Sequence, residues 1–491
     1  MAILIVVNEP SDWPLDLGGG VEIVSSRAYL TNPAYAEMRG VKVFNLCRSY
    51  RYQSFGYYVS LLAAARGHKP LPSITTIQDL KLPTMVRLAG DELDELIQTT
   101  LHRLSSERFV LSIYFGQNMA QRCARLALSL FNLFPAPLLR ATFARSGDRW
   151  ELRSMGPIPA DEVPEEHWLF VLSAANEYFR RRQRLRRSNP KYDLAILYDP
   201  KADYPPSNPS AMRRFIRAAR TVGFRPEIIG KDDFGRLAEF DALFIRETTA
   251  VNHHTYRFAR RAVAEGLVVI DDPVSIARCT NKVYLAELLT RNDLPGPKTM
   301  IVYRENLDQV GATVGFPCVL KTPDSSFSRG VVRVLDEAAL AQAAEGMLER
   351  SDMVIAQEFV KSEFDWRVGI VDRKPLYVCR YHMAKDHWQI MRTDEKGERQ
   401  YGEIDTLTVE EAPKRVVRLA LKVANLIGDG LYGVDLKQVK GKCYVMEVND
   451  NPSLDGGFED RLLKNRLYES VLQVLYDRLA NRKHASPSGT R

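Results

Sequence analysis

The segment at residues 432–454, YGVDLKQVKGKCYVMEVNDNPSL, constrains the fold of this chain more than any other. It contains two apolar runs on either side of Lys440-Gly441-Lys442, which predicts two antiparallel strands joined by a tight turn. Side chains alternate between the two faces of a strand, so Glu447 and Asn449 share a face. Asp435 can oppose them from the partner strand.

Two carboxylates and one side-chain amide on one face of a hairpin are a suitable donor set for a hard metal ion. Mg²⁺ takes a few protein oxygens and keeps its other positions for water and phosphate. We therefore expect Asp435, Glu447 and Asn449 to bind Mg²⁺, with Mn²⁺ as the alternative metal. The other interpretation is a strand whose polar residues face water, but the apolar residues of the same run favour a buried strand.

A metal held by oxygens without histidine points to phosphate chemistry, and two upstream lysines are placed to bind phosphate. Lys282 opens the predicted helix NKVYLAELL, where its ammonium would act together with the helix N-terminus on an anion. Lys321 closes the apolar strand FPCVLK. The polar loop that follows offers a polyphosphate its backbone N–H groups and the side chains of Ser325, Ser326, Ser328 and Arg329. Either lysine alone would more often be plain surface charge. Together, upstream of the acidic hairpin, they favour a nucleotide site.

A third segment, VIAQEFV at residues 354–360, reads as an apolar strand. Such a segment can present backbone N–H and C=O groups to an adenine edge, although taken alone it is only a buried strand. The run GDGLYG at residues 428–433 matches G-x-G-x-x-G but follows a predicted helix and precedes a strand. This order is the reverse of the dinucleotide-binding fingerprint, and no P-loop motif occurs.

Composition excludes several classes of protein. The 491 residues are 45% hydrophobic and 26% charged, an ordinary globular mixture, which excludes collagen-like and wholly disordered chains. A net charge of +7 is small for this length, so it fits phosphate ligands but does not argue for nucleic acid. Six widely spaced cysteines without a CxxC pair predict reduced thiols and a cytoplasmic location. The N-terminus reads as a strand rather than a signal peptide, and we expect no membrane span.

Patterning predicts three domains and a flexible tail at residues 481–491. Residues 1–188 form an α/β accessory domain, with strands expected at the start of the chain and near residue 42. Residues 189–274 alternate strands with helices, which predicts a small doubly wound parallel sheet. One helix of this domain should begin at Pro209, with Asn208 as its N-cap, and end near Gly223. Residues 275–480 mix long helices with antiparallel-looking strands in a larger α+β domain.

The accessory domain ends in a basic run, FRRRQRLRRSNP, with six arginines between Arg180 and Arg187. One interpretation is a contact with RNA or another polyanion. The other, which we favour, is a solvated helix face that runs into a linker.

Taken in order, these segments resemble the ATP-grasp carboxylate–amine ligases, specifically the RimK-like group. The resemblance rests on Asn281-Lys282, FPCVLK, QEFV, the DWRV that starts at Asp365, Arg380 after an apolar strand, and GVD followed by MEVNDNPSL. It covers about residues 191–475. Residues 1–185 are similar to the N-terminal domain that accompanies some RimK-like ligases. The fold that this implies is a pre-ATP-grasp α/β domain followed by a two-lobed ATP-grasp domain.

The resemblance also implies a role for each matched residue. Lys282 and Lys321 would bind the phosphates of ATP, and the Mg²⁺ held by the hairpin would bridge them. The segment Glu358, Phe359 and Val360 would be the hinge for adenine and ribose, with Asp365 nearby. Arg380 would bind the acyl phosphate or a substrate carboxylate.

This chain departs from the family pattern at two places. Its phosphate loop, DSSFSRG, keeps only Gly330, whereas relatives have a glycine-rich loop. After Arg380 relatives often show an asparagine and a glycine pair, but here the chain reads YHMAKDHWQIM. His387, Trp388 and Gln389 are therefore candidates for a different acceptor pocket.

The sequence thus predicts an ATP- and Mg²⁺-dependent ligase that forms an amide or peptide bond. Its partners would be a small-molecule or peptide carboxylate and an amino acid, for which the resemblance suggests glutamate. A homo-oligomer is compatible with the sequence, whereas a nucleic-acid or membrane partner is not indicated. The alternative is a regulatory module that binds ATP without ligase turnover and docks a polyanion or a protein partner.

Overall fold

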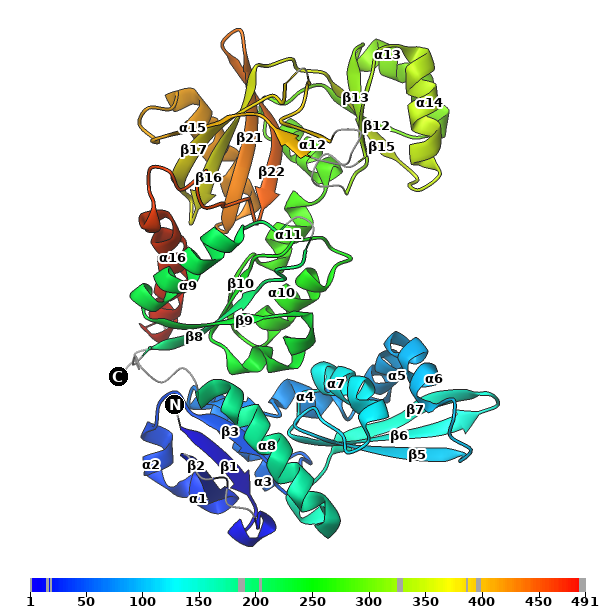
Figure 1. The fold of residues 1–491 in the computed structure, drawn as a ribbon, viewed down its shortest axis with the longest axis vertical. Coiled ribbons are helices and arrows are strands. Elements are labelled where there is room, and N and C mark those ends of the chain that lie inside the picture. Colours follow the sequence, from blue (N-terminus) through cyan, green and yellow to red (C-terminus); the bar gives the residue numbers. More distant parts are fainter. Residues whose placement is uncertain are drawn as a thin grey trace. The chain divides into compact units, whose positions relative to one another are not determined.

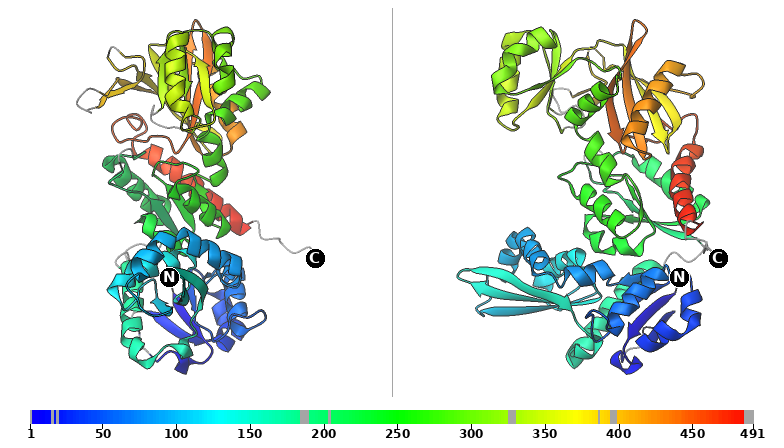
Figure 2. Two further views of the ribbon diagram at one scale, coloured as in Figure 1. Left: turned by 90° about the vertical axis from the view of Figure 1, so that its right-hand side faces the viewer. Right: turned by 180° about the vertical axis from the view of Figure 1, so that it is seen from behind.

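The structure is a computed structural model that describes residues 2–14, 17, 20–183, 190–202, 205–324, 330–385, 387–393 and 399–484. The chain divides into two compact units. The N-terminal unit comprises residues 1–189 and 230–240, and the C-terminal unit comprises residues 190–229 and 241–491. Figures 1 and 2 show the elements of each unit from three directions.

The N-terminal unit contains a parallel sheet of order β2-β1-β3-β4. Alternate residues of its strands enter two different cores: Leu4 and Val6 join one, and Ile5 and Val7 join the other. This burial of both faces is typical of parallel strands covered by helices. The sheet consists of β1 (Ile3–Val7), β2 (Val21–Ser25), β3 (Lys42–Asn45) and β4 (Lys69–Leu71), and its helices are α1 (Ser26–Thr31), α2 (Pro33–Glu37), α3 (Phe55–Ala65) and α4 (Ile74–Asp79).

A second, antiparallel sheet of order β5-β6-β7 completes this unit and shares the larger of the two cores. Its strands are β5 (Arg108–Tyr114), β6 (Leu138–Ser146) and β7 (Arg149–Pro157). The accompanying helices are α5 (Pro83–Glu92), α6 (Asp94–Leu101), α7 (Ala124–Leu133) and α8 (Trp168–Gln183), with short 3₁₀ turns η1 (Pro10–Asp12), η2 (Gln121–Cys123), η3 (Ala160–Glu162) and η4 (Glu165–His167). The side chains of the arginine run at residues 180–187 lie outside the described residues.

Residues 230–240 belong to the N-terminal unit, although the strands before and after them belong to the C-terminal unit. They form the 3₁₀ helix η5 (Lys231–Glu239) where the alternating pattern suggested a helix. Lys42 Nζ lies 3.2 Å from Glu239 Oε2, and these two side chains are 3% and 4% exposed. A buried ammonium needs such a partner, so this ion pair fixes the segment in the unit.

The C-terminal unit begins with a parallel sheet of order β11-β10-β8-β9, which confirms the predicted doubly wound fold. The predicted helix after Asn208 is α9 (Pro209–Val222): the Asn208 side chain accepts a hydrogen bond from Ala211 N, and Gly223 ends the helix with φ 111°. The strands are β8 (Tyr192–Leu197), β9 (Phe224–Ile229), β10 (Ala242–Ile245) and β11 (Val268–Ile270). Helix α10 (His254–Ala264) connects β10 to β11, and α11 (Pro273–Cys279) follows β11.

The final helix, α16 (Asn465–His484), returns to pack on α9 and this parallel sheet in one core (Figure 1). The expected division at residue 274 stays a prediction, as does the tail at residues 481–491, of which residues 485–491 lie outside the described residues.

A four-stranded antiparallel sheet of order β12-β15-β13-β14 follows. One of its faces packs on α13 and α14 through Cys318, Leu320, Val354 and Ala356. The other face therefore carries the residues of opposite parity, among them Lys321. The elements are α12 (Lys282–Arg291), β12 (Thr299–Val302), η6 (Arg304–Gln309), α13 (Val310–Thr313), β13 (Cys318–Lys321), β14 (Val331–Val334), α14 (Glu337–Leu348) and β15 (Val354–Glu358).

A five-stranded antiparallel sheet of order β20-β17-β16-β21-β22 completes the unit. Trp366, Val368, Val434 and Leu436 point to one face and form a core with α15 and α12. The strands are β16 (Phe364–Val371), β17 (Lys374–His382), β20 (Ile404–Leu407), β21 (Leu431–Val439) and β22 (Lys442–Asp450); α15 spans Lys414–Ile427, and β18 (Met391–Thr393) pairs with β19 (Arg399–Tyr401). Across the described residues, every helix is too short or too polar to cross a membrane.

Candidate active site

The hairpin β21–β22 places the three expected metal-binding residues on one face. Asp435 is paired directly with Glu447 across the ladder, and Gly433 is paired with Asn449. Lys440 and Gly441 form the turn, with φ of 45° and 83°, as expected for a two-residue hairpin loop. Asn449 Nδ2 donates a hydrogen bond of 3.1 Å to Asp435 Oδ2.

Arg367 is the residue that the sequence-based reasoning missed. It lies opposite Asp435 in β16, and its Nε and Nη2 donate to the two carboxylate oxygens at 2.7 Å each. Burial raises the pKa of the Asp435 carboxyl above its usual value, and the Arg367 guanidinium opposes that rise. The motif DWRV contained a usable signal, because Asp365 and Arg367 are two residues apart in a strand and must share a face.

The two lysines reach this face from different elements. Lys282 is the first residue of α12, whose N-cap Asn281 accepts a hydrogen bond from Tyr284 N. Lys282 Nζ lies 3.5 Å from Glu447 Oε1. At the end of β13, Lys321 Nζ donates to Gln357 Oε1 at 2.6 Å.

Burial lowers the pKa of Lys321 to about 8. Glu447 acts against that change, whereas Lys282 and Lys437 add to it. Lys321 is thus within electrostatic range of Lys282 and of Glu447, one of the metal-binding candidates. A cluster of cations next to paired carboxylates is suited to a metal-bound polyphosphate.

The expected hinge begins at Glu358, the last residue of β15. Glu358 N donates to Lys298 O at 2.8 Å, and Phe359 N donates to Pro317 O at 3.3 Å, so both groups hold the segment in place. Val360 is buried. Asp365 Oδ1 lies 2.7 Å from Lys437 Nζ, on the sheet face that carries Arg367.

Arg380 lies on the other face of the five-stranded sheet. It is paired with Trp366, a core residue of that face, and its Nη2 lies 3.0 Å from Asp405 Oδ2. The guanidinium carbon is 5.4 Å from the centre of the Phe364 ring. The structure therefore does not bring Arg380 to Asp435, because it is one residue out of phase with the strand positions that face the site.

Of the expected phosphate loop, Gly330 is described, whereas Ser328 and Arg329 lie outside the described residues. Gly330 has φ 63°, and its carbonyl accepts a hydrogen bond from Thr322 N at 3.1 Å. A Cβ atom added at this position would lie 2.6 Å from Thr322 Oγ1. Both the backbone conformation and the close contact thus require glycine.

The donor set, two carboxylates and one side-chain amide, is of the kind that binds a hard divalent ion. Among the described residues, no group of three or more His, Cys, Asp or Glu side chains is arranged to hold a metal. Asp435 and Glu447 are balanced in the structure by Arg367 and Lys282. A metal at this hairpin would therefore depend on Asn449 and on oxygens of the bound phosphates as well.

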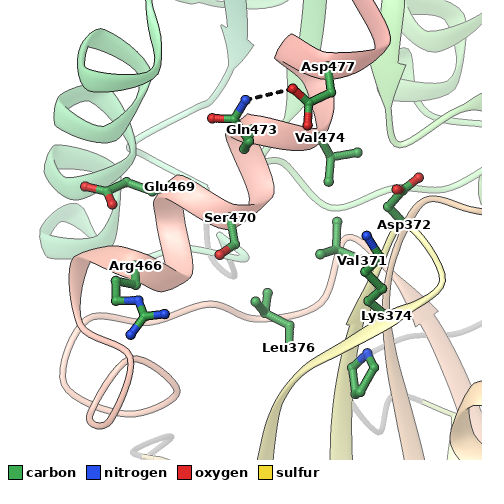
Figure 3. Close-up of a pocket in the computed structure, with 11 residues that line it drawn as sticks. Val371, Asp372, Lys374, Leu376, Arg466, Glu469, Ser470, Gln473, Val474 and Asp477 are labelled. Carbon is green, nitrogen blue, oxygen red and sulfur yellow. Dashed lines mark hydrogen bonds between the residues drawn. The ribbon is translucent and has the colours of Figure 1, made fainter.

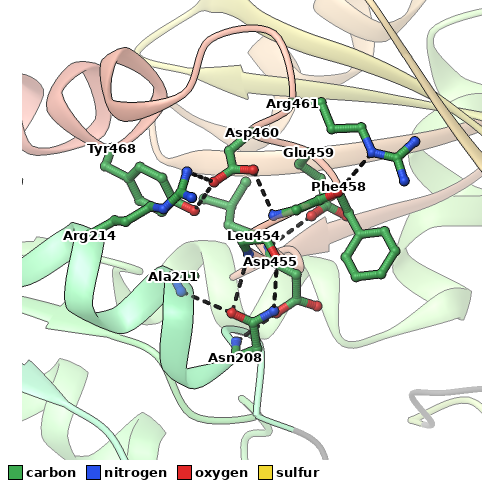
Figure 4. Close-up of polar contacts among 12 residues, drawn as sticks. Asn208, Ala211, Arg214, Leu454, Asp455, Phe458, Glu459, Asp460, Arg461 and Tyr468 are labelled. Atoms are coloured by element: carbon green, nitrogen blue, oxygen red, sulfur yellow. Dashed lines mark hydrogen bonds and ion pairs between the residues drawn. The ribbon is translucent and has the colours of Figure 1, made fainter.

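A polar network fixes the segment that follows β22 (Figure 4). Asp455 Oδ1 accepts from Asn208 N at 2.6 Å, and Glu459 Oε2 accepts from Asp455 N at 2.7 Å. The other oxygen of Glu459 accepts from the Tyr381 hydroxyl. Arg367 stacks on that same tyrosine ring at 4.9 Å, so the network also helps to hold the guanidinium in place.

A cavity of about 450 Å³ lies between α16 and the turn that joins β16 to β17. The residues that line it include Asp372, Lys374, Arg466 and Glu469, and Figure 3 shows how they are arranged. None of the expected nucleotide or metal ligands lines it, so this cavity is distinct from the candidate active site.

Two family models match the chain. The RimK-like ATP-grasp N-terminal domain matches residues 26–174, and the RimK-like ATP-grasp domain matches residues 279–465. These two family models identify an ATP-grasp enzyme. The chain is a RimK-like ATP-grasp protein, which confirms the resemblance seen in its motifs.

Curated relatives are ligases. The α-aminoadipate–LysW ligase LysX of Saccharolobus solfataricus is 27% identical over 49% of this chain and 88% of its own length. A probable α-L-glutamate ligase of Cellvibrio japonicus is 27% identical over 45% of this chain and 72% of its own. A crystal structure of a RimK domain ATP-grasp protein from Sphaerobacter thermophilus has a TM-score of 0.43 and 18% identity, covering 57% of this chain and 98% of that one.

The family model and the curated relatives confirm the predicted enzyme class, an ATP-grasp carboxylate–amine ligase that forms a carbon–nitrogen bond, over the regulatory alternative. Enzymes of this family use ATP and a divalent metal.

Proposed function

We propose that this ligase activates a carboxylate with ATP and joins it to the amino group of an amino acid, with glutamate or a close homologue as the first candidate. ATP transfers its γ-phosphoryl group to the carboxylate. The amine then attacks the acyl phosphate and displaces phosphate, which leaves an amide, ADP and phosphate. The names of the relatives, which include ligases for glutamate and aminoadipate, support an amino acid as one substrate.

The observation that carries this proposal is the convergence of separate elements on one site. Lys282 from α12 meets Glu447 from β22, and Arg367 from β16 meets Asp435 from β21. Lys321 from β13 interacts electrostatically with the first pair. Phosphoryl transfer needs positioning and neutralisation of charge rather than a protein nucleophile, and this arrangement offers both.

Each residue has a defined role in the proposal. Lys282 and Lys321 bind the phosphates. Asp435, Glu447 and Asn449 would hold Mg²⁺, which neutralises the charge of the phosphates when it is bound. Glu358, Phe359 and Val360 would hold adenine and ribose, with Asp365 nearby.

Arg367 takes the role that the sequence suggested for Arg380. Its guanidinium lies on the metal face and is oriented by two hydrogen bonds, so it can contact an acyl phosphate next to Asp435. A cytoplasmic location is also part of the proposal, and the six cysteines, all free, support a reducing compartment.

The test is ADP release by the full chain with ATP, Mg²⁺, and pools of carboxylates and amino acids. We expect release that requires both pools, with an amide of the matching mass in the product. Glu447→Gln should abolish this release, because it removes a charge at the metal with almost no change in volume. Glu345→Gln, on the exposed side of α14, is the matched control and should retain full turnover. Tight ATP binding without release stimulated by any pool would contradict the proposal.

A further inference from the structure

A cluster of aromatic and cationic side chains lies beside the expected hinge. The rings of Phe359 and Trp388 are 5.7 Å apart at an interplanar angle of 75°, an edge-to-face contact. The guanidinium carbon of Arg333 is 5.2 Å from the Phe359 ring and 5.9 Å from the Trp388 ring. One cation thus contacts both rings, and these contacts favour a fixed arrangement of the three side chains.

The three residues come from different parts of the C-terminal unit. Arg333 is paired with Val319, two residues before Lys321, so it lies on the same face of the four-stranded sheet as that lysine. Phe359 directly follows β15. Trp388 belongs to residues 387–390, which follow the β17 strand of the five-stranded sheet. The cluster therefore joins the phosphate-binding face of one sheet to a segment that leaves the other.

Hydrogen bonds hold residues 387–390 in a compact shape. His387 N donates to Ala384 O at 2.9 Å, and Gln389 N donates to His387 Nδ1 at 3.1 Å. The imidazole ring stacks on Trp388, with 6.0 Å between ring centres and an angle of 29°. Trp388 is thus oriented from both sides, by His387 of its own segment and by Phe359 of the hinge.

We propose that Trp388 is a positioning residue that ties residues 387–390 to the nucleotide hinge and so couples nucleotide binding to acceptor binding. This inference rests on the proposed function. His387 and Gln389 are the polar residues of the segment that can contact an acceptor, and the Trp388–Phe359 contact fixes their distance from the adenine site. Coupling between the two sites is reciprocal, so a nucleotide that orders the hinge also prepares the segment.

The position of Arg333 makes tryptophan fluorescence a direct measure of nucleotide binding near Trp388. Because Arg333 shares a face with Lys321, bound phosphates attract its guanidinium and change its contact with the indole ring. We expect Mg²⁺ with the β,γ-imido analogue of ATP to change the tryptophan emission of the full chain. Trp388→Phe should abolish this change, whereas Trp168→Phe, a substitution in the N-terminal unit, should retain it.

Calorimetry with the same analogue measures the coupling to the hinge. Trp388→Ala should weaken nucleotide binding about threefold to tenfold, the size expected for one aromatic contact and one cation–π contact. Trp388→Phe keeps a ring against Phe359 and should restore most of the affinity. Arg333→Met should weaken binding, and Arg333→Lys, which retains the charge, should weaken it less.

The outcomes separate this inference from the proposed function. A wild-type chain that binds no Mg²⁺–nucleotide contradicts the proposed function and the inference together. If the nucleotide binds but the change in emission persists in Trp388→Phe, or Trp388→Ala binds as tightly as wild type, the role of Trp388 is wrong and the nucleotide site stands.

Discussion

Lys282, at the start of α12, and Glu447, in β22, approach to 3.5 Å although most of the ATP-grasp domain separates them in sequence. Each is held by its own element, one by a capped helix and the other by a strand ladder. In the proposed complex the ammonium turns to phosphate and the carboxylate to the metal. The ion pair therefore marks where the nucleotide and the metal meet.

The first prediction concerns the ion pair of Arg367 and Asp435, whose side chains are 13% and 16% exposed. Arg367→Met leaves a largely enclosed carboxylate without its cation, so we expect a loss of stability below the roughly 3–5 kcal/mol that removing one partner of a fully buried pair costs. Arg367→Lys keeps the positive charge but loses the two parallel hydrogen bonds to the carboxylate. We expect this variant to fold and its turnover to fall about a hundredfold, which is the typical effect of removing one hydrogen-bond donor to a transition state. Urea unfolding and ADP release measure the two effects. Normal turnover in Arg367→Lys would show that the guanidinium does not act on the reacting phosphate.

A pH dependence follows from Lys321, whose pKa is lowered to about 8 by burial. The protonated ammonium binds phosphate, so nucleotide affinity of the free enzyme should be full below this pKa and fall as the pH rises through it. Calorimetry across this range should show the fall in wild type. Lys321→Met should bind weakly and without this pH dependence, and an equal fall in that variant would assign the titration to another group.

The pair of Lys42 and Glu239 gives a prediction for the N-terminal unit. Glu239→Gln removes the charge that balances a nearly fully buried ammonium, so we expect a loss of about 3–5 kcal/mol in the free energy of unfolding. Glu162→Gln is the matched control, because its pair with Arg140 is exposed and such pairs contribute less than about 1 kcal/mol. Urea midpoints of the full chain compare the two. Equal midpoints would contradict the burial of the Lys42 pair.

Residues 230–240 determine whether the C-terminal unit remains folded when residues 1–189 are removed. Leu237 and Phe240 are buried within the N-terminal unit, so removing residues 1–189 alone exposes them. We expect that truncation to aggregate. Replacing residues 230–240 as well with a Gly/Ser linker of equal length should give a folded chain that binds nucleotide. Size-exclusion chromatography and calorimetry test both versions, and equal behaviour would show that the segment does not depend on its partner surface.

Local signals in the sequence were sufficient for the elements near the site. The cap at Asn208, the glycine at position 223 and the turn at Lys440-Gly441 predicted α9 and the β21–β22 hairpin, because each of these features acts within a few residues. The common face of Glu447 and Asn449 followed from the two-residue period of a strand.

Contacts between residues that are distant in the sequence could not be predicted from such local signals. The sequence did not reveal that Arg367 faces Asp435 and that Arg380 lies on the other face, because the strand positions that face Asp435 depend on a register set by the whole five-stranded sheet. Likewise, the sequence pattern of residues 230–240 resembles a surface helix. Only the folded N-terminal unit shows that Glu239 meets a buried lysine.

Binding of Mn²⁺, measured by electron paramagnetic resonance with and without the β,γ-imido analogue of ATP, tests the central claim most directly. The ion and the analogue should each bind the full chain more tightly when the other is present. In Glu447→Gln and in Lys282→Met this mutual enhancement should be lost while the fold is retained. Undiminished enhancement in both variants would contradict a shared nucleotide and metal site at this hairpin.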